Sequence, residues 1–96
     1  MNADFSSIQN TTERLVYRAI AATLSSYPGL ADDAERLADV ACVALNRLPP
    51  RYIRHAVDFA FFTTERQRQD SERQVAEAVD FAFGFVQARV AMGARA

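Results

Sequence analysis

The stretch that decides how this chain folds is Leu45-Asn46-Arg47-Leu48-Pro49-Pro50-Arg51-Tyr52. Two consecutive prolines fix φ, remove two backbone donors and push the residue before each of them toward an extended conformation. The helical pattern that runs into this stretch therefore ends there, in a stiff Pro-Pro corner (residues 45–54). The corner carries asparagine, arginine and tyrosine side chains, and His55 follows it. Such a corner is either a site for an anion or a planar ligand, or a structural helix end.

Two helices are predicted before the corner, from apolar residues that recur at helical spacing. The first begins at Asn10, where Glu13 completes a capping-box pattern, and it ends at Pro28-Gly29. The second opens with the same pattern at Asp32 and Glu35. The positions expected to face the core are Leu15, Val16, Ala19, Ile20, Thr23, Leu24 and Tyr27 in the first helix, and Leu37, Ala38, Val40, Ala41, Ala44, Leu45 and Leu48 in the second.

The region after the corner contains no proline, so it forms either one long helix or two. Tyr52 and Ile53 are expected to be extended, with helix resuming near Arg54. A break is possible near Thr63-Thr64, because Thr64 and Gln67 have the spacing of a helix cap. The sequence thus predicts a small all-α domain of four or so helices over residues 10–92, with a flexible lead-in at 1–9 and a tail at 93–96.

A short internal repeat adds a second apolar surface. Ala56–Phe61 reads Ala-Val-Asp-Phe-Ala-Phe and recurs as Ala78–Phe83. In one continuous helix the two copies would share a face, because their offset is close to six turns. The stretch between them, Glu65–Glu77, is mostly charged and amide residues, which is typical of a projecting or partner-facing segment. An intertwined homodimer would cover both apolar clusters; folding of both onto the first two helices of one chain is the alternative.

Composition limits the possible classes of protein. The chain has 96 residues, half of them hydrophobic, which suits one domain. It has no apolar run long enough to span a membrane and no signal-peptide pattern, and its single cysteine suits a reducing cytoplasm, where we expect it. All 11 basic residues are arginine and the net charge is −1, so the broad basic surface of a duplex-binding protein is missing.

Residues for catalysis or metal binding are few. Cys42 is expected on the buried side of the second helix as a small core thiol, and His55 has no second ligand at metal spacing. Capping and solvation explain Asp32, Asp33 and Glu35, and Asp39 is expected to pair with an arginine of the corner. There is no glycine-rich phosphate loop. We therefore expect a protein that is not an enzyme and that needs no metal or cofactor.

The sequence of the corner resembles sequences of the late competence protein ComFB family. Members of that family typically have an acidic residue, then a short aliphatic run, Leu-Asn and a proline-containing turn that ends in tyrosine. Asp39–Tyr52 has this pattern. Asn10–Val16 is similar to the family's N-terminal Asn-x-x-Glu-x-x-Val segment. Many members also carry a cysteine cluster that looks like a zinc site, but residues 28–38 contain no cysteine here. We therefore do not expect this chain to have the zinc site.

The resemblance implies a dimeric receptor for a cyclic dinucleotide that passes the signal to a protein partner, such as a transcription factor. The corner's arginines can pair phosphates or read the O6 and N7 atoms of guanine, and its tyrosine can stack on a base. Adenine's N6 amine would oppose an arginine donor, so cyclic di-GMP is favoured over cyclic di-AMP. The expected ligand-binding residues are Asn46, Arg47, Pro49, Pro50, Arg51, Tyr52 and Arg54. The alternative is a dimeric helical adaptor without nucleotide binding; direct nucleic-acid binding is not expected.

Overall fold

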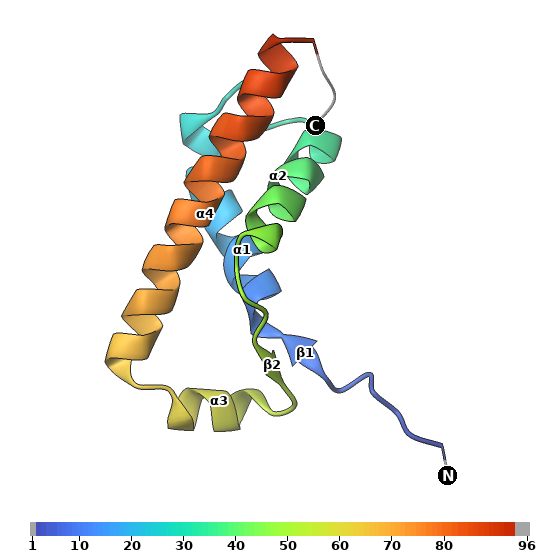
Figure 1. The fold of residues 1–96 in the computed structure, drawn as a ribbon, viewed down its shortest axis with the longest axis vertical. Helices are drawn as coiled ribbons and strands as arrows, with labels where there is room; N and C mark the ends of the chain where they lie inside the picture. Colours follow the sequence, from blue (N-terminus) through green and yellow to red (C-terminus); the bar gives the residue numbers. More distant parts are fainter. Residues whose placement is uncertain (1, 94–96) are drawn as a thin grey trace.

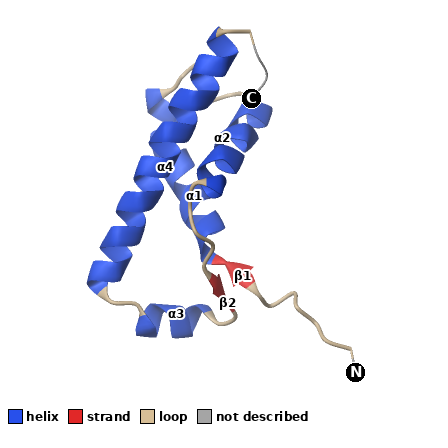
Figure 2. Cartoon of the chain, viewed as in Figure 1, coloured by secondary structure: helices blue, strands red, loops and turns tan. Residues whose placement is uncertain are grey.

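The computed structural model describes residues 2–93, and most of them are helical, as the sequence predicts (Figures 1 and 2). Met1 and residues 94–96 of the expected tail lie outside this range. The elements in chain order are β1 (Gln9–Asn10), α1 (Thr11–Thr23), a 3₁₀ turn η1 (Leu24–Ser26), α2 (Ala34–Asn46), β2 (Tyr52–Ile53), α3 (Ala56–Phe62) and α4 (Glu65–Ala91). The two strands form one short antiparallel ladder, in which Asn10 lies opposite Tyr52 and Gln9 opposite Ile53.

The core lies where α1 and α2 pack against the C-terminal half of α4 (Figure 1). Its buried side chains are Val16, Ile20, Leu30, Val40, Ala44, Val75, Ala78, Val79, Ala82, Phe83 and Val86. The ring of Tyr27 stacks on that of Phe83 with 4.6 Å between centroids. Small residues at three of these positions let the helices approach closely. Among residues 2–93 no helix is long and apolar enough to cross a membrane.

The beginnings of α1 and α2 show which parts of the capping predictions were right. The Asn10 side chain accepts from the Thr12 amide, but Glu13 accepts from the Tyr17 hydroxyl at 3.2 Å instead of closing a capping box. The second cap is Asp33 rather than Asp32, since its carboxylate accepts from an amide at the third helical position at 3.1 Å. In each helix the cap side chain therefore bonds a helical amide, but the reciprocal bond of a capping box is not formed.

Both of these helices also end earlier than the sequence predicts. α1 ends at Thr23, whose hydroxyl bonds back to the Ala19 carbonyl at 2.7 Å, so the break precedes Pro28-Gly29. α2 ends at Asn46 because the residue before each proline of the corner avoids the helical region. The expected extended conformation of Tyr52 and Ile53 is confirmed, since these two residues are β2.

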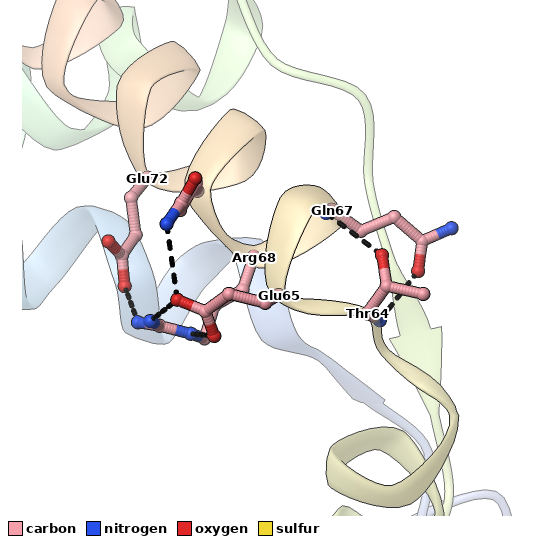
Figure 3. Close-up of polar contacts among 6 residues, drawn as sticks. Thr64, Glu65, Gln67, Arg68 and Glu72 are labelled. Atoms are coloured by element: carbon pink, nitrogen blue, oxygen red, sulfur yellow. Dashed lines mark hydrogen bonds and ion pairs between the residues drawn. The ribbon is translucent and has the colours of Figure 1, made fainter.

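A break at Thr63-Thr64 separates α3 from α4, which selects the two-helix alternative. Thr64 and Gln67 form a reciprocal capping box, with bonds of 3.1 and 2.9 Å (Figure 3). Beside it the Arg68 guanidinium bonds Glu65 and Glu72. The hydrogen bond from Arg68 holds the pKa of Glu65 below its usual value. The start of α4 is thus organised by local polar contacts, because it lies away from the core.

The two copies of the repeat have different environments, because the chain forms two helices here and the condition for a shared face, one continuous helix, is not met. The second copy lies in the core, where Val79 and Phe83 are fully buried. The first copy forms α3, where Phe61 is 81% exposed and its neighbour Phe62 is 76% exposed. The break at Thr63-Thr64 separates the copies and turns α3 away from the line of α4 (Figure 1). Only one of the two clusters folds onto the first two helices.

Alanine substitution at the equivalent positions Phe83 and Phe61 should separate these environments. We expect Phe83→Ala to lower the free energy of unfolding by about 3–5 kcal/mol, because it empties a buried site. Phe61→Ala should change it by less than about 0.5 kcal/mol at low protein concentration. Urea unfolding followed by circular dichroism measures both, and Phe83→Leu provides a milder variant if the alanine form does not fold. Equal losses at both positions would contradict the buried and exposed assignment.

Candidate functional site

The backbone of the Pro-Pro corner is held by the N-terminus of α1. The Asn10 Oδ1 atom accepts from the amides of Arg51 at 2.8 Å and Thr12 at 3.1 Å. The Arg51 carbonyl accepts from the amide of Thr11 at 2.8 Å and from its hydroxyl at 3.1 Å. The Thr12 hydroxyl donates to the Pro49 carbonyl at 3.0 Å, and Thr12 is the one buried polar residue in the described part of the chain. The corner is thus fixed on both sides of Pro50.

Two arginines of this corner lie on phenylalanine rings. The Arg47 guanidinium carbon is 3.7 Å from the ring centroid of Phe81, and that of Arg51 is 5.1 Å from the ring of Phe59. Phe59 and Phe81 occupy equivalent positions in the two copies of the repeat. Each copy therefore supplies the ring under one arginine, in a geometry typical of cation–π contacts.

Neither of these arginines forms an ion pair with a carboxylate in the part of the chain that the structure describes. The Arg51 guanidinium makes one polar contact, at 3.5 Å to the Ser71 hydroxyl. The expected pairing of a corner arginine with Asp39 is not present, since Asp39 forms no ion pair with any residue from 2 to 93. The guanidinium groups of Arg47 and Arg51 are therefore not in direct contact with a carboxylate of the described residues.

Two hollows that share Pro49 in their linings lie against α4. The Arg51 hollow has a volume of about 270 Å³ and includes Pro50, Phe59 and Ser71 in its lining. The Arg47 hollow has a volume of about 380 Å³, and its lining consists of Arg47, Leu48, Pro49, Gln74, Glu77 and Ala78. Leu48, Pro49 and Gln74 line both hollows. Each hollow therefore has one arginine, and an apolar and amide boundary separates them.

Four of the seven predicted ligand-binding residues line these hollows, namely Arg47, Pro49, Pro50 and Arg51. Asn46, Tyr52 and Arg54 line neither of them. The Asn46 amide donates to the Cys42 carbonyl at 3.0 Å, which is the helix-end role that competes with ligand binding. Tyr52 lies in β2 with its side chain 67% exposed.

The residues that α3 and α4 contribute to the hollows were not predicted from the sequence. They are Phe59, Ser71, Gln74, Val75, Glu77 and Ala78. For Phe59 the internal repeat was the available signal, because its copies carry equivalent rings. No pattern in the sequence marks Gln74 or Glu77, which lie in a stretch that reads as a solvated helix face.

The expectation that Cys42 is buried in the core is wrong. It is exposed, not buried, as is Ala38 one turn before it on the same helix. The register of α2 directs Val40 and Ala44 into the core, which turns these two small residues outward. Within residues 2–93 no group of three or more histidine, cysteine, aspartate or glutamate residues is arranged to hold a metal ion.

Comparison of the chain with known protein families gave a match. The family described as late competence development protein ComFB matches residues 9–90, which is most of the sequence. The chain belongs to the ComFB family. The matched range contains β1, the corner and nearly all of α4, so both ComFB-like segments and both hollows lie within it. Comparisons with curated proteins and with solved structures gave no match.

Asn10 provides a test of how the corner is held. We expect Asn10→Ala to lower the free energy of unfolding by about 1–3 kcal/mol, because the amides of Thr12 and Arg51 both lose their acceptor. Asn10→Asp keeps an acceptor oxygen and should stay close to the wild type. Urea unfolding of the three proteins compares them. A loss as large in Asn10→Asp as in Asn10→Ala would contradict the acceptor role.

Proposed function

We propose that this ComFB-family chain is a non-enzymatic receptor for a cyclic dinucleotide, with cyclic di-GMP favoured over cyclic di-AMP, and that it relays binding to a protein partner. One observation carries the proposal. Arg47 and Arg51 lie beside adjoining hollows, each on a phenylalanine ring and neither paired with a carboxylate. Such guanidinium groups suit a ligand that has both anionic and planar parts.

The chemistry of a cyclic dinucleotide matches this arrangement. The ligand carries two phosphates and two flat bases, while the corner supplies two arginines, and α3 and α4 supply the two rings on which they lie. An arginine donates two parallel hydrogen bonds to a phosphate or to the O6 and N7 atoms of guanine, which lysine does not do. A ligand with a single phosphate and a single base would use only half of the groups present.

The rigidity of the corner favours tight binding. Its backbone is fixed by the prolines and by the bonds from Asn10, Thr11 and Thr12. The rings of Phe59 and Phe81 restrict the two guanidinium groups before a ligand arrives. A binding site ordered in advance loses less conformational entropy when it binds, so more of the interaction energy appears as affinity.

We also propose that the chain is a homodimer whose contact includes α3. The apolar residues Val57, Phe61 and Phe62 of α3 are each more than two-thirds exposed. A partly apolar hollow of about 300 Å³ lies between α1, α3 and α4, and Arg14 and Arg18 are in its lining. The α3 helix of a second copy would bring apolar side chains and the carboxylate of Asp58 to this hollow.

A helical adaptor without a nucleotide site is the second candidate. It is favoured by the exposed apolar face of α3 and by the polar stretch at the start of α4, which together form a surface suited to a protein partner. An adaptor requires neither Arg47 nor Arg51, whereas a receptor requires both. The two candidates therefore differ in their response to nucleotides and to these substitutions.

A thermal shift titration with cyclic di-GMP, cyclic di-AMP and GTP tests the receptor. We expect cyclic di-GMP at a hundredfold over its dissociation constant to add about 2.7 kcal/mol of apparent stability, since only the folded state binds it. Arg47→Ala and Arg51→Ala should lose most of the shift, and Arg66→Ala should keep it as a control for arginine loss on an exposed face. No shift with any cyclic dinucleotide would favour the adaptor.

Sedimentation velocity tests the dimer. We expect the wild type to sediment as a dimer, and Phe61→Glu to sediment as a monomer because it places a charge in an apolar contact. Met92→Glu is the matched control, since Met92 is also 81% exposed but lies at the other end of α4. A monomeric wild type, or a dimer that survives in Phe61→Glu, would overturn contact through α3.

A further inference from the structure

We propose that Glu77 determines base specificity by accepting hydrogen bonds from guanine in the Arg47 hollow. This inference rests on the proposed function and extends it to a residue outside the corner. Glu77 comes from α4, while Arg47 follows the last turn of α2, so two elements bring a donor and an acceptor to the same hollow.

The carboxylate of Glu77 is available for a ligand. It has no hydrogen bond or ion pair with any residue from 2 to 93, unlike Glu65 and Glu72 earlier on the same helix, which bond Arg68. Glu77 lies one turn before Phe81, and the Arg47 guanidinium lies on the ring of Phe81. Glu77 and the ring under Arg47 therefore start from positions about 6 Å apart along the axis of α4, and both Glu77 and Arg47 line the same hollow.

The hydrogen-bonding edges of guanine match this pair. The O6 and N7 atoms accept, and a guanidinium donates to both. The neighbouring N1–H and N2–H₂ groups donate, and a carboxylate accepts from both. Adenine reverses the pattern, because its N6 amine would face the arginine donors and its N1 lone pair would face the carboxylate. An arginine together with a glutamate therefore discriminates between the bases at two edges.

The walls of the hollow suit a planar ring. Leu48, Pro49 and Ala78 supply apolar surface, and Ala78 is only 5% exposed. The Gln74 amide lies at the boundary with the Arg51 hollow, and it has no hydrogen-bond partner among the described side chains. A base bound here would exclude water from the two charged groups, which strengthens their hydrogen bonds to it.

The proposed role of Glu77 predicts a change in ligand affinity opposite to the one expected from charge alone. Cyclic dinucleotides carry two negative charges, so removing a nearby carboxylate should strengthen binding if only long-range electrostatics matter. A direct hydrogen-bonding role predicts the opposite. Asp80 is the matched control, because it is exposed on the same helix, lines neither hollow and has the same charge.

Isothermal titration calorimetry on the wild type, Glu77→Gln and Asp80→Asn tests the proposal. The probes are cyclic di-GMP, cyclic di-AMP and cyclic di-IMP, whose hypoxanthine bases lack the N2 amine. We expect Glu77→Gln to weaken cyclic di-GMP binding roughly 10- to 100-fold, and to reduce the preference for cyclic di-GMP over cyclic di-IMP. Cyclic di-AMP binding should not weaken, and Asp80→Asn should bind cyclic di-GMP at least as tightly as the wild type.

Two results would overturn the proposal while leaving the receptor intact. One is a Glu77→Gln variant that binds cyclic di-GMP as tightly as the wild type or more tightly. The other is a wild type that does not distinguish cyclic di-GMP from cyclic di-IMP. If no cyclic dinucleotide binds the wild type, the proposed function fails as well. Unchanged thermal unfolding of ligand-free Glu77→Gln verifies that the variant is folded.

Discussion

The carboxamide of Asn10 is the contact on which the arrangement of this molecule depends. Its oxygen accepts from the first turn of α1 and from the chain just after Pro50, so one atom joins the start of the first helix to the end of the corner. The prolines have no amide hydrogen, and the carbonyl beside Pro50 bonds Thr12. The two segments that resemble the ComFB family are therefore bonded to each other.

Local chemistry made part of this fold predictable. The caps at Asn10 and Thr64 and the extended residues after the corner follow from spacing and from proline sterics, and the structure contains them. The environments of the two repeat copies were not predictable, because identical residues have identical propensities. What separates them is tertiary: one copy follows Val75 into the core, and the other precedes the break at Thr63-Thr64.

The candidate site was also only partly predictable from the sequence. The sequence identified its arginines and prolines, because an interrupted helix with charged residues is visible in one dimension. It did not identify the rings of Phe59 and Phe81, since these become neighbours of the corner only when α3 and α4 fold beside it. Contact between an aromatic ring and a guanidinium from distant parts of the chain leaves no pattern in the local sequence. Residues from distant helices therefore complete a site whose position the sequence indicates.

The break between α3 and α4 has a mechanical consequence. The Thr63 hydroxyl bonds the Phe59 carbonyl, and Thr64 closes a capping box, so polar contacts stiffen the connection from both sides. The start of α4 precedes Val75, where the helix enters the core. Ten helical residues span about 15 Å, so a tilt of about 15° at Val75 would displace the first residue of α4 by about 4 Å. A small rotation beside the hollows would thereby become a larger displacement where α4 joins α3.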